Sequence, residues 1–207
     1  MFITFEGIEG CGKTTQIRRL ARNLERHRIG FVATLEPGGT GVGRKIRKIL
    51  LDARNQGLTP LAELMLYEAD RAQHVEEVVK PALGRGLWVL SDRFFDATVV
   101  YQGFARGQDM KLIKVLNEKA TQGIVPNRTF LLDCPVEVGL ARATARNNKG
   151  QDRFEREKIA FHRKVRQGYL ELAGKHSKRY TVIDATQAVR DLEKEIMEHM
   201  RPFMKSA

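Results

Sequence analysis

The chain has 207 residues, 42% of them hydrophobic, and a formal net charge of +11. This length can bury one substantial core, so we expect a single domain that spans residues 1–207. The composition excludes a disulfide framework and a zinc knuckle, since the only two cysteines, Cys11 and Cys134, are far apart in the sequence.

No apolar run approaches the ~18 residues that would suggest a membrane span. The first residues reach an acid, Glu6, and a glycine, Gly7, too soon for the apolar region of a signal peptide, and they lack its basic leader. We therefore expect a cytoplasmic protein without a membrane partner.

The positive charge could indicate a nucleic-acid partner, and this possibility depends on how the charge is distributed. Basic residues fall into three groups, at 18–28, 44–48 and 142–166. The first two interleave with apolar residues at helical spacing, which is typical of solvated helix faces. We therefore expect no nucleic-acid partner.

Short apolar segments alternate with helix-period segments along the chain, which is the pattern of a parallel sheet covered by helices on both faces. The five predicted strands are Phe2–Glu6, Phe31–Leu35, Leu87–Ser91, Thr129–Asp133 and Tyr180–Asp184. The long helix before the third strand is expected to end at Pro81. The pattern predicts an α/β fold with three layers, α/β/α, and places ligands outside the carboxyl ends of the strands.

The turn after the first strand carries a phosphate-binding motif. Gly7-Ile8-Glu9-Gly10-Cys11-Gly12-Lys13-Thr14 matches the P-loop pattern G-x-x-x-x-G-K-[ST] between a strand and a helix, and we assign this run, with Thr15, to ATP. Its backbone N–H groups can converge on phosphate oxygens, Lys13 adds a positive charge, and the Thr14 hydroxyl can coordinate Mg²⁺. The alternative is a tight turn with an exposed lysine.

The other strand ends narrow the function. The phosphate loop alone leaves a GTPase, an ATPase, a kinase and a nucleotide-binding regulator open, and the lack of an Asn-Lys-x-Asp motif disfavours the GTPase. Asp92 ends the third strand, where its carboxylate would hold Mg²⁺ beside Thr14; Asp133 ends the fourth strand and is the rival for this role. Arg93 offers a planar fork for phosphate oxygens, unless it merely pairs with Asp92.

Tyr67 and Arg71 are four residues apart and therefore lie on one helical face, which differs from the apolar stripe of that helix. A ring that stacks and a planar donor that binds a carbonyl together suit a nucleobase. The alternative is an aromatic side chain packed in the core beside an exposed arginine.

Several motifs together resemble the bacterial thymidylate kinases, a family of P-loop nucleoside-monophosphate kinases. They are Glu36-Pro37-Gly38-Gly39-Thr40, Tyr67-Glu68-Ala69-Asp70-Arg71, Asp92-Arg93-Phe94, and Thr98 with Tyr101-Gln102-Gly103, and the likeness continues to Ile183-Asp184-Ala185-Thr186. The resemblance implies transfer of the ATP γ-phosphoryl group to dTMP, giving dTDP and ADP, with Mg²⁺ as cofactor and a homodimer as the assembly. No general base is required, since the second pKa of a phosphate monoester is about 6 and the acceptor is mostly a dianion.

The resemblance also implies roles within the dTMP site. Tyr67 stacks on the thymine ring, Arg71 hydrogen-bonds a base carbonyl, and Tyr101 lies against the deoxyribose. Thr98 is placed at the base edge, and Glu9 approaches the acceptor's 5′ end or its metal. The expected dTMP-binding set is completed by Glu36, Pro37, Arg93 and Gln102, and the expected catalytic groups near it are Glu9, Lys13 and Arg93.

A basic segment at about residues 142–153 is predicted to form a mobile lid, with a polar break at 147–150. The family divides into members with an arginine in the phosphate loop and members with catalytic arginines in the lid, and the loop position here is Gly10. The resemblance therefore implies lid arginines, with Arg146 and Arg153 as leading catalytic candidates and Arg142 next, on ATP. A solvated basic helix is the alternative.

Two other functions stay open. A deoxynucleoside kinase would phosphorylate a hydroxyl group and use Glu36 as a base, and Arg93 with the thymidylate-kinase motifs disfavours it. A P-loop protein that binds nucleic acid through its basic surface is disfavoured because no basic motif is interleaved with aromatic residues.

Overall fold

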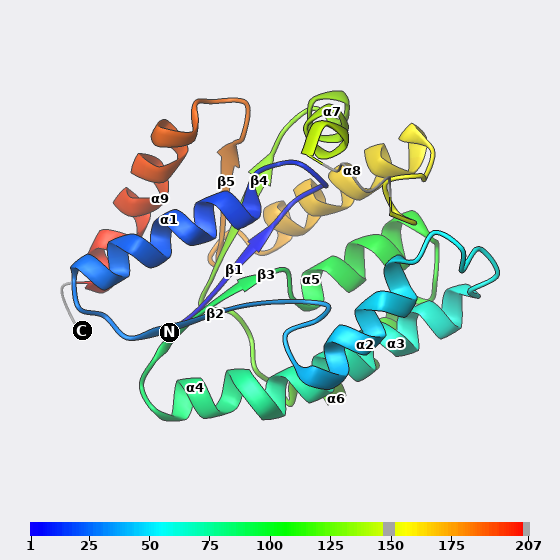
Figure 1. The fold of residues 1–207 in the computed structure, drawn as a ribbon, viewed down its shortest axis with the longest axis horizontal. Helices are drawn as coiled ribbons and strands as arrows, with labels where there is room; N and C mark the ends of the chain where they lie inside the picture. Colours follow the sequence, from blue (N-terminus) through cyan, green and yellow to red (C-terminus); the bar gives the residue numbers. More distant parts are fainter. Residues whose placement is uncertain (147–151, 205–207) are drawn as a thin grey trace.

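The computed structural model describes residues 1–146 and 152–204. Its centre is a sheet of five parallel strands in the order β2-β3-β1-β4-β5 (Figure 1). The strands are β1 (Phe2–Glu6), β2 (Phe31–Leu35), β3 (Trp88–Asp92), β4 (Arg128–Asp133) and β5 (Tyr180–Asp184). All five predicted strands are confirmed, although β3 is shifted by one residue and β4 begins one residue earlier than expected.

Helices cover both faces of this sheet (Figure 1). They are α1 (Lys13–Arg26), α2 (Gly41–Leu51), α3 (Pro60–His74), α4 (Lys80–Gly84), α5 (Phe95–Thr98), α6 (Met110–Thr121), α7 (Val136–Arg146), α8 (Ile159–Lys175) and α9 (Val189–Met204), with π-helical turns η1 (Val75–Val79) and η2 (Val99–Ala105). The predicted three-layer α/β/α architecture is therefore confirmed. Within the described ranges, no helix is long and apolar enough to cross a membrane.

The alternation of side chains along β1 explains why both faces are covered, since successive residues of a strand point to opposite sides. Ile3 and Phe5 belong to one buried cluster with Leu20 of α1 and Ile196 of α9, two helices that pack side by side. Phe2 points the other way and packs against residues of η1 and α4 in a second cluster. Both faces of the strand are buried, as expected for a parallel sheet between helical layers.

The prediction that the long helix ends at Pro81 is wrong. α3 continues through η1 into α4, which has Pro81 in its first turn and ends at Gly84. The first turn of a helix tolerates proline because its N–H groups have no intrahelical acceptor. The change of hydrogen-bonding pattern at η1 places Pro81 at such a position, so the segment continues where a regular helix would be interrupted.

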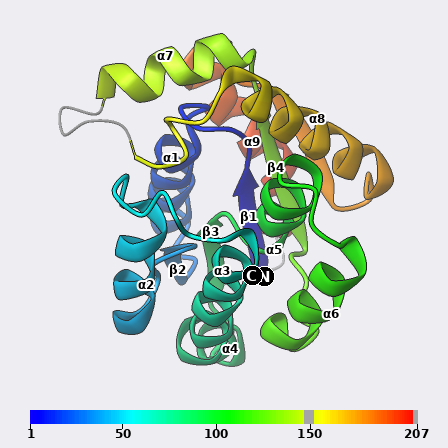
Figure 2. The same cartoon turned by 90° about the vertical axis from the view of Figure 1, so that its right-hand side faces the viewer.

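The carboxyl ends of the strands meet at one edge of the sheet, and α7 and α8 cross the molecule at the end toward which β1 points (Figure 2). Here α7 contacts the phosphate loop backbone directly. A Cβ atom at Gly10 would overlap the carbonyl oxygen of Gly139 in α7, and one at Gly139 would lie 2.6 Å from the carbonyl oxygen of Glu9. Gly10 also has a φ of +71°. Side chains are therefore excluded at both glycines.

Candidate active site

A cavity of about 210 Å³ opens at the carboxyl edge of the sheet. Its walls come from the phosphate loop, the ends of β2 and β3, α2, α3, α5 and η2, and from Asp152, Phe154 and Glu155. The predicted residues among its lining are Glu9, Gly10, Gly12, Lys13, Thr14, Glu36, Pro37, Tyr67, Arg71, Asp92, Arg93, Thr98, Tyr101 and Gln102. Segments far apart in the sequence thus bring every residue expected to bind dTMP to one cavity.

The phosphate loop turns between β1 and α1 through glycines with positive φ, at Gly7, Gly10 and Gly12. Gly7 also packs closely, since a Cβ there would lie 2.5 Å from the carbonyl oxygen of Leu132. The Lys13 ammonium folds back and donates to the carbonyl oxygens of Gly7 and Ile8, at 3.0 and 2.9 Å. The loop therefore presents a positioned positive charge at a helix N-terminus, where anions are stabilised.

Two oxygen groups lie together beside this loop. The Thr14 hydroxyl donates to the Asp92 carboxylate at 2.7 Å. The rival carboxylate, Asp133, instead accepts two hydrogen bonds from Arg166, at 2.7 and 2.8 Å. A carboxylate held by an arginine fork is already neutralised, so the geometry favours Asp92 for a metal.

Arg93 lies at the centre of the site. Its guanidinium donates to the carbonyl oxygen of Gly7, to the hydroxyl of Tyr169 and to Glu9, each at 3.0 Å. The guanidinium also lies over the ring of Tyr101, 4.9 Å from its centroid. Within the described residues Arg93 makes no ion pair with Asp92, so that alternative does not apply in this structure.

Glu9 is the acid of the phosphate loop, and it accepts a hydrogen bond from the Tyr101 hydroxyl at 2.6 Å in addition to that from Arg93. Burial by itself would raise the pKa of the Glu9 carboxyl. His162, Arg93, Lys13 and Tyr101 outweigh burial and hold this pKa well below its usual range. Glu9 is therefore a carboxylate anion at neutral pH, set between cations.

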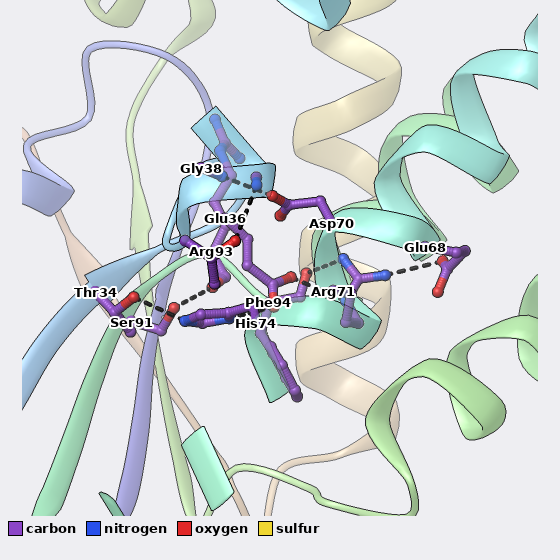
Figure 3. Close-up of polar contacts among 12 residues, drawn as sticks. Thr34, Glu36, Gly38, Glu68, Asp70, Arg71, His74, Ser91, Arg93 and Phe94 are labelled. Carbon is purple, nitrogen blue, oxygen red and sulfur yellow. Dashed lines mark hydrogen bonds and ion pairs between the residues drawn. The ribbon is translucent and has the colours of Figure 1, made fainter. Parts of the chain in front are cut away.

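Arg71 lines the cavity and is buried in a network of acids (Figure 3). It donates to Glu36 at 2.9 Å, and through Nη1 to Glu68 at 2.8 Å and Asn117 at 2.9 Å. Its remaining nitrogen, Nη2, makes the longest bond, 3.3 Å, to the carbonyl oxygen of Phe94. The alternative of an exposed arginine beside Tyr67 is thus wrong, because these acidic groups compensate for the burial of Arg71.

Glu36 has both carboxylate oxygens engaged, which bears on the rival function (Figure 3). One accepts from Arg71, and the other lies 2.7 Å from His74 Nδ1. The other ring nitrogen of His74 lies 2.7 Å from the Thr34 hydroxyl. A general base needs a free oxygen directed at the proton that it removes, so this arrangement favours an orienting role for Glu36.

The segment 152–155 also lines the cavity, which the sequence did not predict. The Phe154 ring is buried and packs edge-on against Tyr67, at 6.3 Å between centroids, and against Tyr101, at 5.7 Å. Asp152 and Glu155 line the cavity beside it. The basic charge of this segment predicts a lid and not a cavity wall, whereas the single aromatic residue in the charged run, Phe154, is the signal that indicates burial.

Two of the lid arginines, Arg142 and Arg153, lie outside the cavity lining as the described residues outline it. Arg153 forms an ion pair with the buried Glu63 and donates to the carbonyl oxygen of Leu50 at 2.8 Å. Arg142, in the last turns of α7, donates to the carbonyl oxygen of Ala185 at 2.8 Å. The Arg146 side chain and the polar break at 147–150 lie outside what the structure describes.

Several known proteins similar to this chain are described as thymidylate kinases. The family model described as thymidylate kinase matches residues 5–196. A thymidylate kinase of Citrifermentans bemidjiense is 54% identical over 209 residues, covering 99% of this chain and 93% of that protein. One of Desulfosudis oleivorans is 57% identical over 190 residues, covering 89% of each. The solved thymidylate kinase of Ehrlichia chaffeensis superposes with a TM-score of 0.79 at 32% identity, covering 97% of this chain and 98% of that one.

Proposed function

The chain belongs to the thymidylate kinase family, and from this premise we propose that the protein transfers the γ-phosphoryl group of ATP to dTMP, giving dTDP and ADP. One observation carries the proposal: every residue expected to bind dTMP lines a single cavity beside the phosphate loop. A thymine nucleotide needs an aromatic wall, a polar group for the base edge and positive charge for the phosphate. Tyr67, Thr98 and Arg93 supply these groups in one place.

We assign the donor phosphates to the phosphate loop. The loop leads directly into the N-terminus of α1, and two loop carbonyls hold Lys13 there. Phosphoryl transfer depends mainly on alignment and on charge that is already in position. Lys13 therefore acts as a fixed cation for the donor.

Mg²⁺ fits the adjacent pair of Thr14 and Asp92, because hydroxyl and carboxylate oxygens are ligands that this ion prefers. Within the described residues no group of three or more His, Cys, Asp or Glu is placed to hold a metal. Mg²⁺ in kinases usually takes few protein ligands and completes its shell with phosphates and water. When bound, the ion would supply charge neutralisation for the phosphates.

We assign the acceptor phosphate to Arg93. Arg93 lines the cavity, and its fork lies between Glu9 and the loop carbonyl of Gly7. The phosphate of dTMP would meet this fork as a dianion and needs no base to become nucleophilic. A hydroxyl acceptor would need one, and the engaged carboxylate of Glu36 argues against the deoxynucleoside kinase.

The base and sugar are assigned to the far wall of the cavity. The Thr98 hydroxyl is buried and has no hydrogen-bond partner in the described part of the chain, so a base edge would satisfy it. Arg71 Nη2, whose bond to Phe94 is long, is the nitrogen assigned to a base carbonyl. Tyr67 would stack on the ring and Tyr101 would limit the space for a ribose 2′-hydroxyl.

The lid arginines complete the proposal. Arg146 and Arg153 would move to the transferring phosphoryl group, and Arg142 would bind ATP, when the segment around 142–153 closes. This requires Arg153 to leave Glu63, its ion-pair partner in the present structure. Arg106 also forms an ion pair with Glu63. Glu63 would therefore stay paired after Arg153 moved to the phosphoryl group, which supports this movement.

An assay of ADP release tests the reaction with dTMP, thymidine, dUMP, dGMP and AMP as acceptors. We expect dTMP to have the highest kcat/KM, and dUMP to lose about 10- to 200-fold, because one methyl group in a pocket contributes about 1 to 3 kcal/mol. Purines should react far less, since they overfill a site sized for one ring. Preference for thymidine would favour the deoxynucleoside kinase, and preference for AMP or dGMP would overturn the thymidylate assignment.

We also propose that the chain acts as one kinase domain and as a homodimer in the cytoplasm. Two packed helices expose apolar residues: Val42 and Ile49 on α2, and Leu61 and Met65 on α3. Apolar side chains gathered on adjacent helices are typical of a protein interface. The free buried cysteines, Cys11 and Cys134, suit a reducing compartment.

A further inference from the structure

We propose that His162 and Tyr169 of α8 are positioning residues that orient Glu9 and Arg93 for the acceptor phosphate. The inference rests on the proposed function and extends it to a helix that contributes no residue to the cavity lining as described. Each of the two residues contacts one member of the Arg93–Glu9 ion pair. Neither would touch the substrate.

Tyr169 supports Arg93 from behind. Its hydroxyl accepts from Arg93 at 3.0 Å and donates to Glu6 at 2.7 Å, and both Tyr169 and Glu6 are fully buried. The other carboxylate oxygen of Glu6 accepts from the backbone N–H of Phe94 at 2.8 Å. The hydroxyl is thus fixed in direction by its own donor bond, and it fixes one nitrogen of the Arg93 fork in turn.

His162 supports Glu9 from the opposite side. The ring is completely buried, and within the described residues neither of its nitrogens has a hydrogen-bond partner. Its Nδ1 faces Glu9 Oε2 at 3.4 Å, and that oxygen is likewise without a hydrogen bond among the described residues. A buried polar atom without a hydrogen-bond partner destabilises the folded protein. His162 Nδ1 and Glu9 Oε2 are two such atoms, and they face each other just beyond the distance of a good hydrogen bond.

A small movement would convert this contact into a hydrogen bond. Hydrogen bonds of catalytic groups are often long in a free enzyme and shorten when substrate is bound. Because a carboxylate can only accept, Nδ1 of His162 must carry the proton. Glu9 Oε1 already accepts from Tyr101 and Arg93, so His162 completes the set of groups that fix the carboxylate.

The helix itself is placed to do this. His162 and Tyr169 are seven residues apart, two turns along one face of α8. The helix packs closely on η2 at Gly168, where a Cβ would lie 3.0 Å from Cβ of Phe104. Both residues are therefore carried by one tightly packed element, and a shift of α8 would move the supports of Glu9 and Arg93 together.

Kinetic variants test the proposal with ATP and dTMP. His162→Phe keeps a ring without the nitrogen, whereas His162→Asn restores a donor near the Nδ1 position. We expect His162→Phe and Tyr169→Phe to lower kcat/KM for dTMP about tenfold each, a typical effect of one hydrogen bond to a charged group, with KM for ATP unchanged. His162→Asn should recover most of the loss. The control is Tyr180→Phe. Tyr180 is a buried tyrosine of β5 that makes no hydrogen bond to Glu9 or Arg93 in the described structure.

A double-mutant cycle separates positioning from a structural role. If His162 acts through Glu9, the effects of the two substitutions are not additive. In a Glu9→Gln background, His162→Phe should then lower kcat/KM for dTMP by less than about twofold, instead of the tenfold expected in the wild type. Equal losses in both backgrounds, no rescue by asparagine, or wild-type values for dTMP in both single variants would overturn the proposal. Failure of the wild type to phosphorylate dTMP would instead overturn the proposed function, so the two failures are distinguishable.

Discussion

Arg93 has a left-handed backbone, with a φ of +72°, which a residue with a side chain rarely adopts. Its backbone N–H donates to the carbonyl oxygen of Phe5 at 3.0 Å, while the guanidinium turns back to Gly7 and Glu9. Such a conformation is retained only where the surroundings compensate for it, commonly at a functional site. The strain lies directly after β3 and sets the direction of the fork that we assign to the acceptor phosphate.

Lys13→Ala and Asp92→Asn should each reduce kcat at least about 100-fold while the fold is retained. The first removes the cation held at the phosphate loop, and the second weakens the oxygen pair with Thr14. Steady-state kinetics and circular dichroism on both variants measure this. Normal turnover in either folded variant would contradict the assignment of the donor site.

Asp70→Asn should change how stability depends on pH. Burial raises the pKa of Asp70 from 3.8 to about 6, and the negative charge of the neighbouring Glu36 is the second cause of this increase. The folded protein thus binds this proton more tightly than the unfolded chain, so the free energy of unfolding falls as pH rises from about 4 to 6 and levels off above. Asparagine keeps an acceptor for the Gly38 N–H and does not titrate.

Relative to wild type, the Asp70→Asn variant should therefore gain about 2 to 3 kcal/mol between pH 4 and pH 7, the equivalent of two pKa units. Urea unfolding at several pH values in this window gives the difference directly. A difference that stays constant across the window would show that Asp70 titrates normally in the folded protein.

At the scale of single residues, the sequence motifs predicted many residues of the cavity lining, because a glycine-rich loop and charged strand ends rarely have a purely structural role. The motifs did not predict which side chains these residues contact. Arg71 pairs with Glu36, thirty-five positions away, and Glu9 faces His162 on α8. Contacts between distant segments depend on packing that no local pattern records. The aromatic residue in the charged run indicates that Phe154 is buried, but it does not say that Phe154 packs against Tyr67 and Tyr101.

At the scale of elements, the sheet followed from its short apolar strands, since periodicity and β-branched residues indicate buried parallel strands. Pro81 was misleading, because η1 shifts the hydrogen-bonding pattern so that the proline begins α4. The basic segment was interpreted by charge alone. Part of it, at 142–146, is the end of α7, and residues 152–155 form a wall of the cavity.

The lid hypothesis makes a prediction at this scale. Arg153→Ala should lower kcat by up to about 10³-fold and change KM for dTMP little, because a lid arginine acts mainly at the transition state. Arg156→Ala removes the same charge from an exposed position three residues beyond Arg153 and serves as the control.

The melting temperature distinguishes this role from a structural one. Arg153 pairs with Glu63 in the present structure, so its loss could act through stability alone. An Arg153→Ala variant with a lowered melting temperature and an unchanged kcat would assign the residue to the ion pair and contradict the catalytic role.

At the scale of the whole molecule, the proposed homodimer predicts that charge on the exposed faces of α2 and α3 disrupts assembly. We expect the wild type to sediment as a dimer and Leu61→Asp to sediment as a monomer, because a buried unpaired charge is costly. Val125→Asp is the control, since Val125 is equally apolar and exposed but precedes β4. A monomeric wild type would contradict the proposal, as would a dimer unaffected by Leu61→Asp.

The contact between Gly10 and Gly139 constrains how this enzyme could evolve. The resemblance implies that some members of the family carry an arginine at the position of Gly10, whereas here any side chain at this position would collide with the backbone of α7. Relocating the arginine from lid to loop would therefore require α7 to shift before or together with the substitution. A variant with only the arginine at position 10, or only the shift of α7, should be less active than one with both changes or with neither. The two arrangements are therefore separated by an epistatic barrier. We therefore expect lineages with this glycine contact to lack an arginine in the phosphate loop, as the proposed lid assignment requires.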